Sequence, residues 1–176
     1  MAAVGGAQEG RRTRARVRPR GGGVANVETG IPALDHLLRL TARYGDLELA
    51  LEVAPGGPLQ EVADAGRAVG EELAAAFSAG GVRGLGSAVV PADEALAHVA
   101  LEASGRPLLV SNVDLSDARV GGLETDAVAR FLDALATAAG LTVHVRLLEG
   151  RETQHVLDGI FKALGVALAQ ALRPAS

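Results

Sequence analysis

The stretch Thr29-Gly30-Ile31-Pro32-Ala33-Leu34-Asp35-His36-Leu37-Leu38 marks the start of a helix and sets the fold of this chain. Pro32 suits the first turn of a helix, because the backbone N–H that proline lacks has no partner there anyway. Leu34, Leu37 and Leu38 then recur at helical spacing. The pattern predicts an amphipathic helix over residues 31–43 whose leucine face packs on a core.

Outward from this helix, the hydrophobic pattern alternates between strands and helices. Leucines at 47, 49 and 51 alternate with polar or small residues, which predicts a half-buried strand. A helical pattern over 62–77 then ends at Gly80-Gly81. The same criteria predict strands near 88–90, 99–101, 108–110 and 141–147, and helices over 124–139 and 154–172.

The order of these elements contains a repeat. Helix, strand, loop and helix follow one another over 31–77 and again over 128–172. Leu34-Asp35 matches Leu132-Asp133, and the helix entry at 60–64 matches that at 154–158. We expect an α+β fold built from two similar βα halves that arose by internal duplication. One domain would span 24–176, with halves of about 24–90 and 91–176.

Composition limits the function. With 48% hydrophobic and only 2% aromatic residues, the chain can form one compact core of Leu, Val and Ala. The chain has no cysteine, so a metal would need His, Asp or Glu ligands, which suit manganese, iron or zinc. A formal charge of −4 makes nucleic acid an unexpected partner for the body of the protein. We expect no membrane segment and a cytoplasmic protein, because long apolar runs and a signal-peptide core are missing.

Residues 1–23 form an Arg- and Gly-rich N-terminal arm. Arginines alternate with other residues from Arg12 to Arg20, and Gly21-Gly22-Gly23 follows. The arm either binds nucleic acid or another acidic surface, or it is a solvated, disordered tail whose alternating part forms an edge strand.

Three later segments complete a pattern with residues 29–38. They are Val90-Pro91-Ala92-Asp93-Glu94-Ala95-Leu96-Ala97, then Ser104-Gly105-Arg106-Pro107, and then 142–150 running on to His155 and Phe161-Lys162-Ala163. In this order, over about 29–172, they resemble the imidazoleglycerol-phosphate dehydratase family of histidine biosynthesis. The resemblance implies helices packed between β-sheets, a manganese-dependent hydro-lyase, and an assembly of 24 subunits. It also implies a second N-terminal strand, in whose place this chain has the triglycine.

The resemblance implies two manganese ions between subunits, held by one His-His-x-x-Glu motif from each half. His36, His144 and His155 stand at ligand positions, and Asp158 replaces a Glu. Tyr44 and Gln154 stand where the family has His, and the first-half motif falls on 59–64 without any imidazole. We therefore expect partial manganese occupancy or none. The alternative for each His is a satisfied polar residue near a subunit contact, and His98 has no partner motif.

The resemblance also implies a binding site for a phosphorylated substrate. Arg106 and Lys162 match family positions that contact phosphate, and Arg83 lies one residue before a third. Arginine suits phosphate because its planar fork donates several hydrogen bonds. Asp93 and Glu94 match an Asp-Glu pair that would line the site, with Glu94 the candidate catalytic group. The alternatives are a turn residue at Arg106, an exposed helix charge at Lys162, and a loop brace at Asp93 and Glu94.

Three functions remain open from the sequence. The first is a relative of the dehydratase whose activity is lost or much reduced. The second is a working imidazoleglycerol-phosphate dehydratase. The third is a non-catalytic protein that forms homo-oligomers, either trimers or 24-mers, and that binds a phosphorylated metabolite or assembles with an active dehydratase paralogue.

Overall fold

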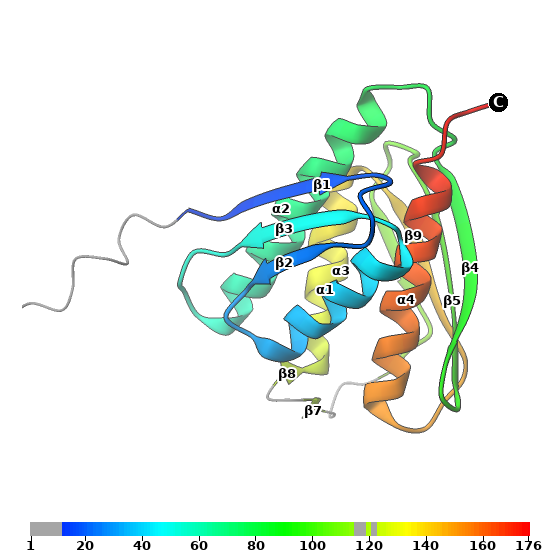
Figure 1. The fold of residues 1–176 in the computed structure, drawn as a ribbon. Helices are drawn as coiled ribbons and strands as arrows, with labels where there is room; N and C mark the ends of the chain where they lie inside the picture. Colours follow the sequence, from blue (N-terminus) through cyan, green and yellow to red (C-terminus); the bar gives the residue numbers. More distant parts are fainter. Residues whose placement is uncertain (1–11, 115–118, 121–122) are drawn as a thin grey trace, which may run out of the picture.

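The computed structural model describes residues 12–114, 119–120 and 123–176. Within them, two main sheets enclose a double layer of helices (Figure 1). The first sheet contains β1 (Arg14–Arg18), β2 (Ala25–Glu28) and β3 (Glu48–Glu52), in the order β1-β3-β2. The second contains β4 (Leu85–Ala92), β5 (Ala95–Glu102), β6 (Leu108–Ser111) and β9 (Thr142–Glu149), in the order β4-β5-β9-β6. A short ladder joins β7 (Arg119–Val120) to β8 (Leu123–Glu124).

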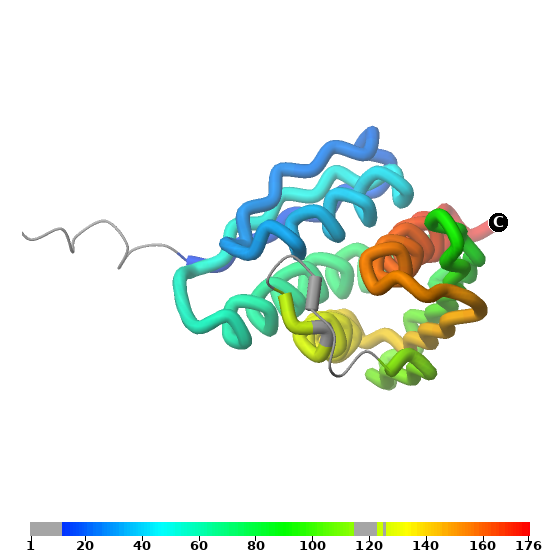
Figure 2. Tube along the Cα trace, turned by 90° about the horizontal axis from the view of Figure 1, so that it is seen from below, coloured from blue at the N-terminus to red at the C-terminus, as the bar shows by residue number. Residues whose placement is uncertain are grey.

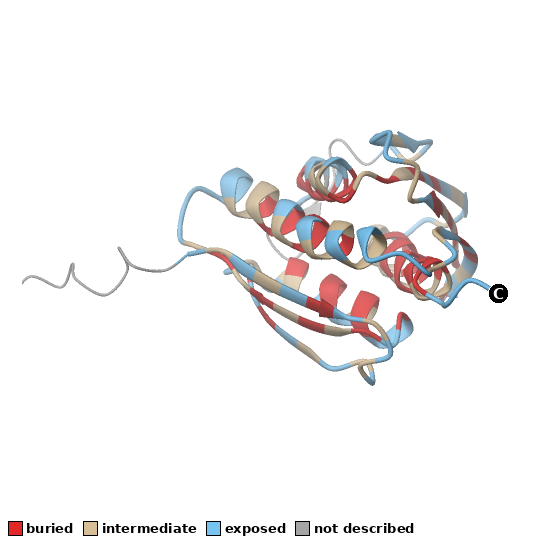
Figure 3. Ribbon diagram, turned by 90° about the horizontal axis from the view of Figure 1, so that it is seen from above, coloured by how far each residue is buried: buried red, intermediate tan, exposed pale blue. Residues whose placement is uncertain are grey.

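The helices lie between the sheets, as the resemblance implies. They are α1 (Pro32–Tyr44), α2 (Pro58–Ser78), α3 (Thr125–Ala139) and α4 (Thr153–Ala171). The first sheet packs on α1 and α2, and α4 covers β4 and β5. Each helix turns its buried face toward the space between the sheets (Figure 3).

Helix bounds agree with the sequence pattern except at the start of α2. The helix begins at Pro58, earlier than the apolar periodicity predicts, because Pro58 occupies the first turn, where proline is tolerated. Strand β2 follows the triglycine, and the hydrophobic pattern did not predict it. Strand β1 lies at the edge of its sheet and comes from the Arg-rich segment.

The two halves share a topology and interlock. Strand β3 pairs antiparallel with β1 and parallel with β2, and β9 pairs in the same way with β5 and β6. Each half's first helix packs on the other half's second helix, so α1 contacts α4 and α2 contacts α3 (Figure 2). The core is therefore continuous across both halves.

Glycines bring the paired helices close together. A Cβ added at Gly70 of α2 would lie 2.6 Å from the carbonyl oxygen of Leu135 and 2.7 Å from the Cβ of Ala138 on α3. On the other pair, Gly165 of α4 packs against the backbone of Thr41, whose Oγ1 donates a hydrogen bond of 3.0 Å to the carbonyl of Phe161. These contacts fix the position of α4, which carries most of the candidate site.

Candidate functional site

The first turns of α4 hold one cluster of polar side chains around Asp158. Gln154 Nε2 donates to Asp158 Oδ1 over 2.7 Å, within one turn of the helix. His36 Nε2, from α1, lies 3.1 Å from the same oxygen. Asp158 thus joins the two helices, and the structure brings together two of the metal-ligand positions predicted from the sequence, His36 and Asp158.

A second cluster joins α4 to the turn between β4 and β5. Glu94 Oε2 lies 2.6 Å from His155 Nδ1, and Asp93 Oδ2 lies 3.3 Å from His155 Nε2. The other oxygen of Glu94 accepts hydrogen bonds from the backbone N–H groups of Arg151 and Glu152, at 3.3 and 2.9 Å. Glu94 therefore braces the loop before α4, which was the alternative to a catalytic role.

The contacts of Glu94 and His155 determine their charge. The N–H of Glu152 first, and then the His155 imidazole, lower the pKa of Glu94 from 4.5 to about 2. The hydrogen bond that His155 Nδ1 donates to Glu94 raises the pKa of His155 above 6.5. Both ring nitrogens of His155 face carboxylate oxygens, which only accept hydrogen bonds, so the geometry favours the doubly protonated ring. A histidine must be neutral to bind a metal.

His144 lies apart from both clusters. Its neighbours Val143 and Val145 are buried on the helix side of β9, so His144 projects from the exposed outer face of the sheet. His98 of β5 is half-buried on that face too, and its Nε2 lies 2.7 Å from Ser87 Oγ on β4. The alternation of valine and polar residues along β9 could have shown from the sequence that His144 lies on the outer face, away from His155.

The first-half counterpart of the motif, at the start of α2, contains no imidazole. Gln60 Nε2 donates to Asp64 Oδ1 over 2.8 Å, and Arg67 binds the same oxygen at 2.7 Å. Glu61 accepts the backbone N–H of Gly56 over 3.0 Å. Within the described ranges, no group of three or more His, Asp or Glu side chains could hold a metal ion.

The three basic residues predicted to bind phosphate come from three different segments of the fold. Arg83 lies near the end of the helix, where its N–H donates to the carbonyl of Arg173. Arg106 follows β5, at the end of that strand opposite the turn with Asp93 and Glu94. Because β5 spans eight residues, Arg106 lies roughly 25 Å from the turn that carries Asp93 and Glu94.

Lys162 lies in the middle of α4, between the start of the helix with His155 and the end of the helix near Arg83. Its Nζ is 5.1 Å from the centre of the Tyr44 ring, close enough for a cation–π contact. One chain thus does not bring Lys162, Arg83 and Arg106 to a common point beside His155. A cavity of about 600 Å³ is lined by Arg83 together with Phe77, Val82 and several small residues, which include Gly84 and Gly140.

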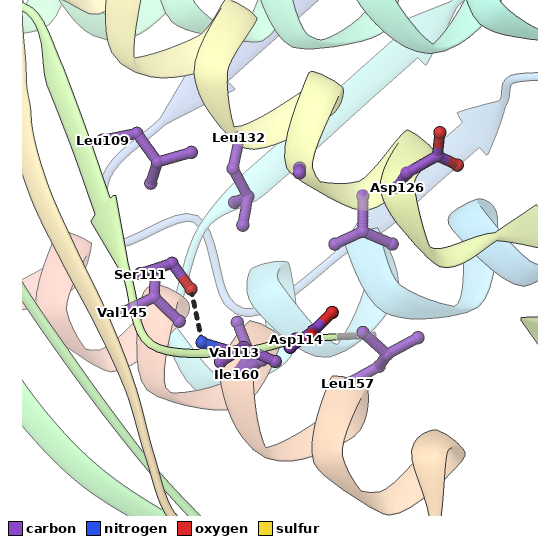
Figure 4. Close-up of a pocket in the computed structure, with 11 residues that line it drawn as sticks. Leu109, Ser111, Val113, Asp114, Asp126, Leu132, Val145, Leu157 and Ile160 are labelled. Atoms are coloured by element: carbon purple, nitrogen blue, oxygen red, sulfur yellow. Dashed lines mark hydrogen bonds between the residues drawn. The ribbon is translucent and has the colours of Figure 1, made fainter. Parts of the chain in front are cut away.

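A separate cavity of about 190 Å³ lies between α3, α4 and β6 (Figure 4). Leu109, Leu132, Leu157 and Ile160 make its walls mostly apolar. Ser111 Oγ accepts the N–H of Val113 over 3.1 Å at one side of the cavity. No site residue predicted from the sequence lines it.

The whole chain can be compared with known proteins. The family model for imidazoleglycerol-phosphate dehydratase matches residues 29–168. The chain belongs to the imidazoleglycerol-phosphate dehydratase family. The dehydratase of Desulfitobacterium hafniense is 39% identical over 168 residues, which cover 92% of this chain and 85% of that protein. The dehydratase of Syntrophobacter fumaroxidans is 45% identical over 159 residues, with 87% and 80% covered.

Solved structures of the family have the same fold. The crystal structure of the Staphylococcus aureus dehydratase aligns with a TM-score of 0.85 and 32% identity, covering 93% of this chain and 95% of that one. The Pyrococcus furiosus dehydratase, in complex with (S)-C348, aligns with a TM-score of 0.77 and 26% identity, covering 94% and 92%. The α+β architecture expected from the sequence is confirmed. No described helix is long and apolar enough to cross a membrane.

The manganese pair that the family implies does not fit the described residues of one chain. Imidazole nitrogens are the donors such a site needs beside carboxylates. The first-half motif supplies none, and Asp158 already accepts hydrogen bonds from His36 and Gln154. Both ring nitrogens of His155 already contact carboxylates, those of Glu94 and Asp93. We therefore derive no catalytic step through a bound metal.

Proposed function

We propose that this protein is a dehydratase-family member whose hydro-lyase activity on imidazoleglycerol phosphate is lost or much reduced. The observation that carries the proposal is the start of α2, where residues 59–64 contain no histidine. The resemblance places the family's His-His-x-x-Glu there, with Leu59, Gln60 and Ala63 at its ligand positions. The second-half motif is also changed, since Gln154 replaces a His and Asp158 a Glu. A metal-dependent reaction needs its ligands.

A working dehydratase is the second candidate. Identities of 39–45% over most of the chain to proteins named imidazoleglycerol-phosphate dehydratase favour it. Retention of Arg106, Lys162 and the Asp93-Glu94 pair also favours it, because these match residues that would contact substrate.

Dehydration of imidazoleglycerol phosphate with saturating manganese distinguishes the two. We expect no product above the metal-only background, even at high protein concentration, and less than stoichiometric manganese after reloading. Turnover comparable to that of an active family member would overturn the proposal. A matched variant with Leu59→His, Gln60→His, Ala63→Glu, Gln154→His and Asp158→Glu should gain manganese. The second-half pair of changes alone is its control and should gain less.

The proposed role is non-catalytic binding or assembly in the cytoplasm. One exposed sheet face carries several large apolar side chains, at Leu85, Val89, Leu108, Val110 and Leu148. Such a face supports a homo-oligomer, either a trimer or a 24-mer, and co-assembly with an active dehydratase paralogue. Mass measurement in solution tests the first, and co-purification of the two chains tests the second. A monomer at micromolar concentration would contradict the first, and failure of the two chains to co-purify would contradict the second.

We further propose that residues 24–176 act as one domain with halves of 24–90 and 91–176, and that a phosphorylated small molecule is the ligand. Arg83, Arg106 and Lys162 supply the positive charge for it, as neighbouring subunits come together. Calorimetric titration with imidazoleglycerol phosphate tests this. Unchanged affinity in Arg106→Ala would remove that residue from the site.

A further inference from the structure

Among the residues that the structure describes, no strand covers the outer edge of β1, whereas the corresponding edge of the second sheet is covered. Strands β1 and β5 take equivalent places, because each pairs antiparallel with the central strand of its sheet. Strand β4 covers the far edge of β5. Among the residues that the structure describes, β1 pairs only with β3. Over the described ranges the first sheet therefore has one strand fewer than the second, and a fourth strand would lie beside β1.

The open edge presents main-chain groups of Ala15 and Val17. The N–H of Leu49 in β3 donates to a carbonyl next to β2. Successive residues of a strand turn their main-chain groups to opposite sides, so Ala50 faces β1, where it lies opposite Arg16. The N–H and C=O groups of Ala15 and Val17 then point away from β3. They are available to an added strand.

The positive side chains of β1 favour an added strand with negative side chains. Arg14, Arg16 and Arg18 are exposed on the outer face of the sheet. On the paired side they face acidic residues, since Arg14 lies opposite Glu52 and Arg18 opposite Glu48. A second copy of β1 would place arginine opposite arginine, which is unfavourable, whereas acidic residues at alternate positions would form opposite-charge pairs.

The other face of β1 selects small apolar residues. Val17 is 8% exposed and Ala15 is half-buried, and both contact the core above α2. Pro19, just after β1, lacks an N–H and ends the edge. The geometry points to a docking site for an extended segment of a partner protein. Its acidic residues alternate with small apolar ones, and it adds antiparallel to β1 as a fourth strand.

A pair of peptides tests this on the full chain. The probe is a terminally blocked, fluorescein-labelled peptide of alternating glutamate and valine, and its control has lysine for every glutamate. We expect the glutamate peptide to raise fluorescence anisotropy with at least ~10-fold higher affinity than the lysine peptide. Hydrogen–deuterium exchange should show slower exchange in the presence of the probe at residues 15–17, the segment with the open edge.

Matched variants separate this edge from general charge attraction. Arg16→Glu should weaken binding of the glutamate peptide by ~10-fold, and Arg16→Ala by less, with circular dichroism checking that each variant is folded. Arg130→Glu makes the same charge change at an exposed position on α3 and should leave binding unchanged. Equal effects of Arg16→Glu and Arg130→Glu would overturn the proposal.

Two further results would also overturn it. Amides of Ala15 and Val17 that are already protected from exchange in the free chain would show that the edge is covered. Concentration dependence of that protection would identify a second copy as the cover, and its absence would identify the chain's own residues. A single-stranded oligonucleotide that displaces the peptide at equal concentration would identify the arginines as a nucleic-acid surface instead.

Discussion

Replacing Gly70 by alanine tests whether α2 and α3 approach as closely as the structure shows. By helix propensity alone, the change should stabilise the protein by ~1 kcal/mol. The new Cβ would, however, lie 2.6 Å from the Leu135 carbonyl oxygen. Overpacking of this kind costs ~1–3 kcal/mol. The Leu135 carbonyl and the Ala138 Cβ, which the new Cβ would contact, both belong to α3 and cannot easily move aside. We expect a net loss of stability of up to ~2 kcal/mol, equivalent to a lower Tm by ~2–4 °C per kcal/mol.

Gly159→Ala is the matched control. It makes the same chemical change within α4, where the added Cβ would have its nearest contact, with the Cβ of Ala97, at 3.4 Å. Propensity should then prevail and stability should rise by up to ~1 kcal/mol. Both variants are compared with the unchanged chain by urea unfolding at one protein concentration. Stabilisation by Gly70→Ala would refute the close approach of α2 and α3, whatever Gly159→Ala does.

The remaining predictions concern the core and the second cluster. Phe131→Ala, at a fully buried ring whose centroid lies 5.9 Å from that of Phe161, should cost ~3–5 kcal/mol in urea unfolding. Glu94→Gln should lower the pKa of His155 toward its ordinary value, followed by NMR titration of the ring protons. The stability lost in Glu94→Gln should also depend on pH. The lowered pKa of Glu94 gives stability that is present above 4.5 and fades as the pH falls toward 2. The raised pKa of His155 gives stability that is present below 6.5 and is lost as the pH rises through the raised value. The difference between Glu94→Gln and the unchanged chain should be largest between these limits, and a flat difference across pH 2–9 would contradict the pairing. Gln154→His should raise the affinity for manganese little by itself, measured by calorimetry, because Asp158 keeps its bond to His36.

Hydrophobic periodicity was enough to predict most of the fold. The alternation around Val143 and Val145 predicted β9, and the leucine spacing after Pro32 predicted α1. Strand β2 was not predicted, because Ala25–Glu28 is short and only Val27 is buried. So short a segment shows no alternation of apolar and polar residues in the sequence. Short edge strands are defined by the strands they pair with, which local sequence does not contain.

The sequence could name candidate residues but not the contacts between them. Family resemblance picked out His155 and Glu94 separately, but they are 61 residues apart in the chain. Their pairing depends on how the β4–β5 turn meets the start of α4. The bond between His36 and Asp158 depends in the same way on α1 packing across α4. Such contacts follow from tertiary geometry, which a pattern along one segment does not encode.

The exchange of helix partners between the halves has an evolutionary consequence. Two identical copies of one half, packed as α1 on α4 and α2 on α3, would make a symmetric dimer with each contact occurring twice. In such a dimer, every mutation changes both copies. Once both copies share a single chain, each side accepts substitutions independently. The two sides now differ, since residues 59–64 contain no histidine and the matching helix start in the other half contains His155.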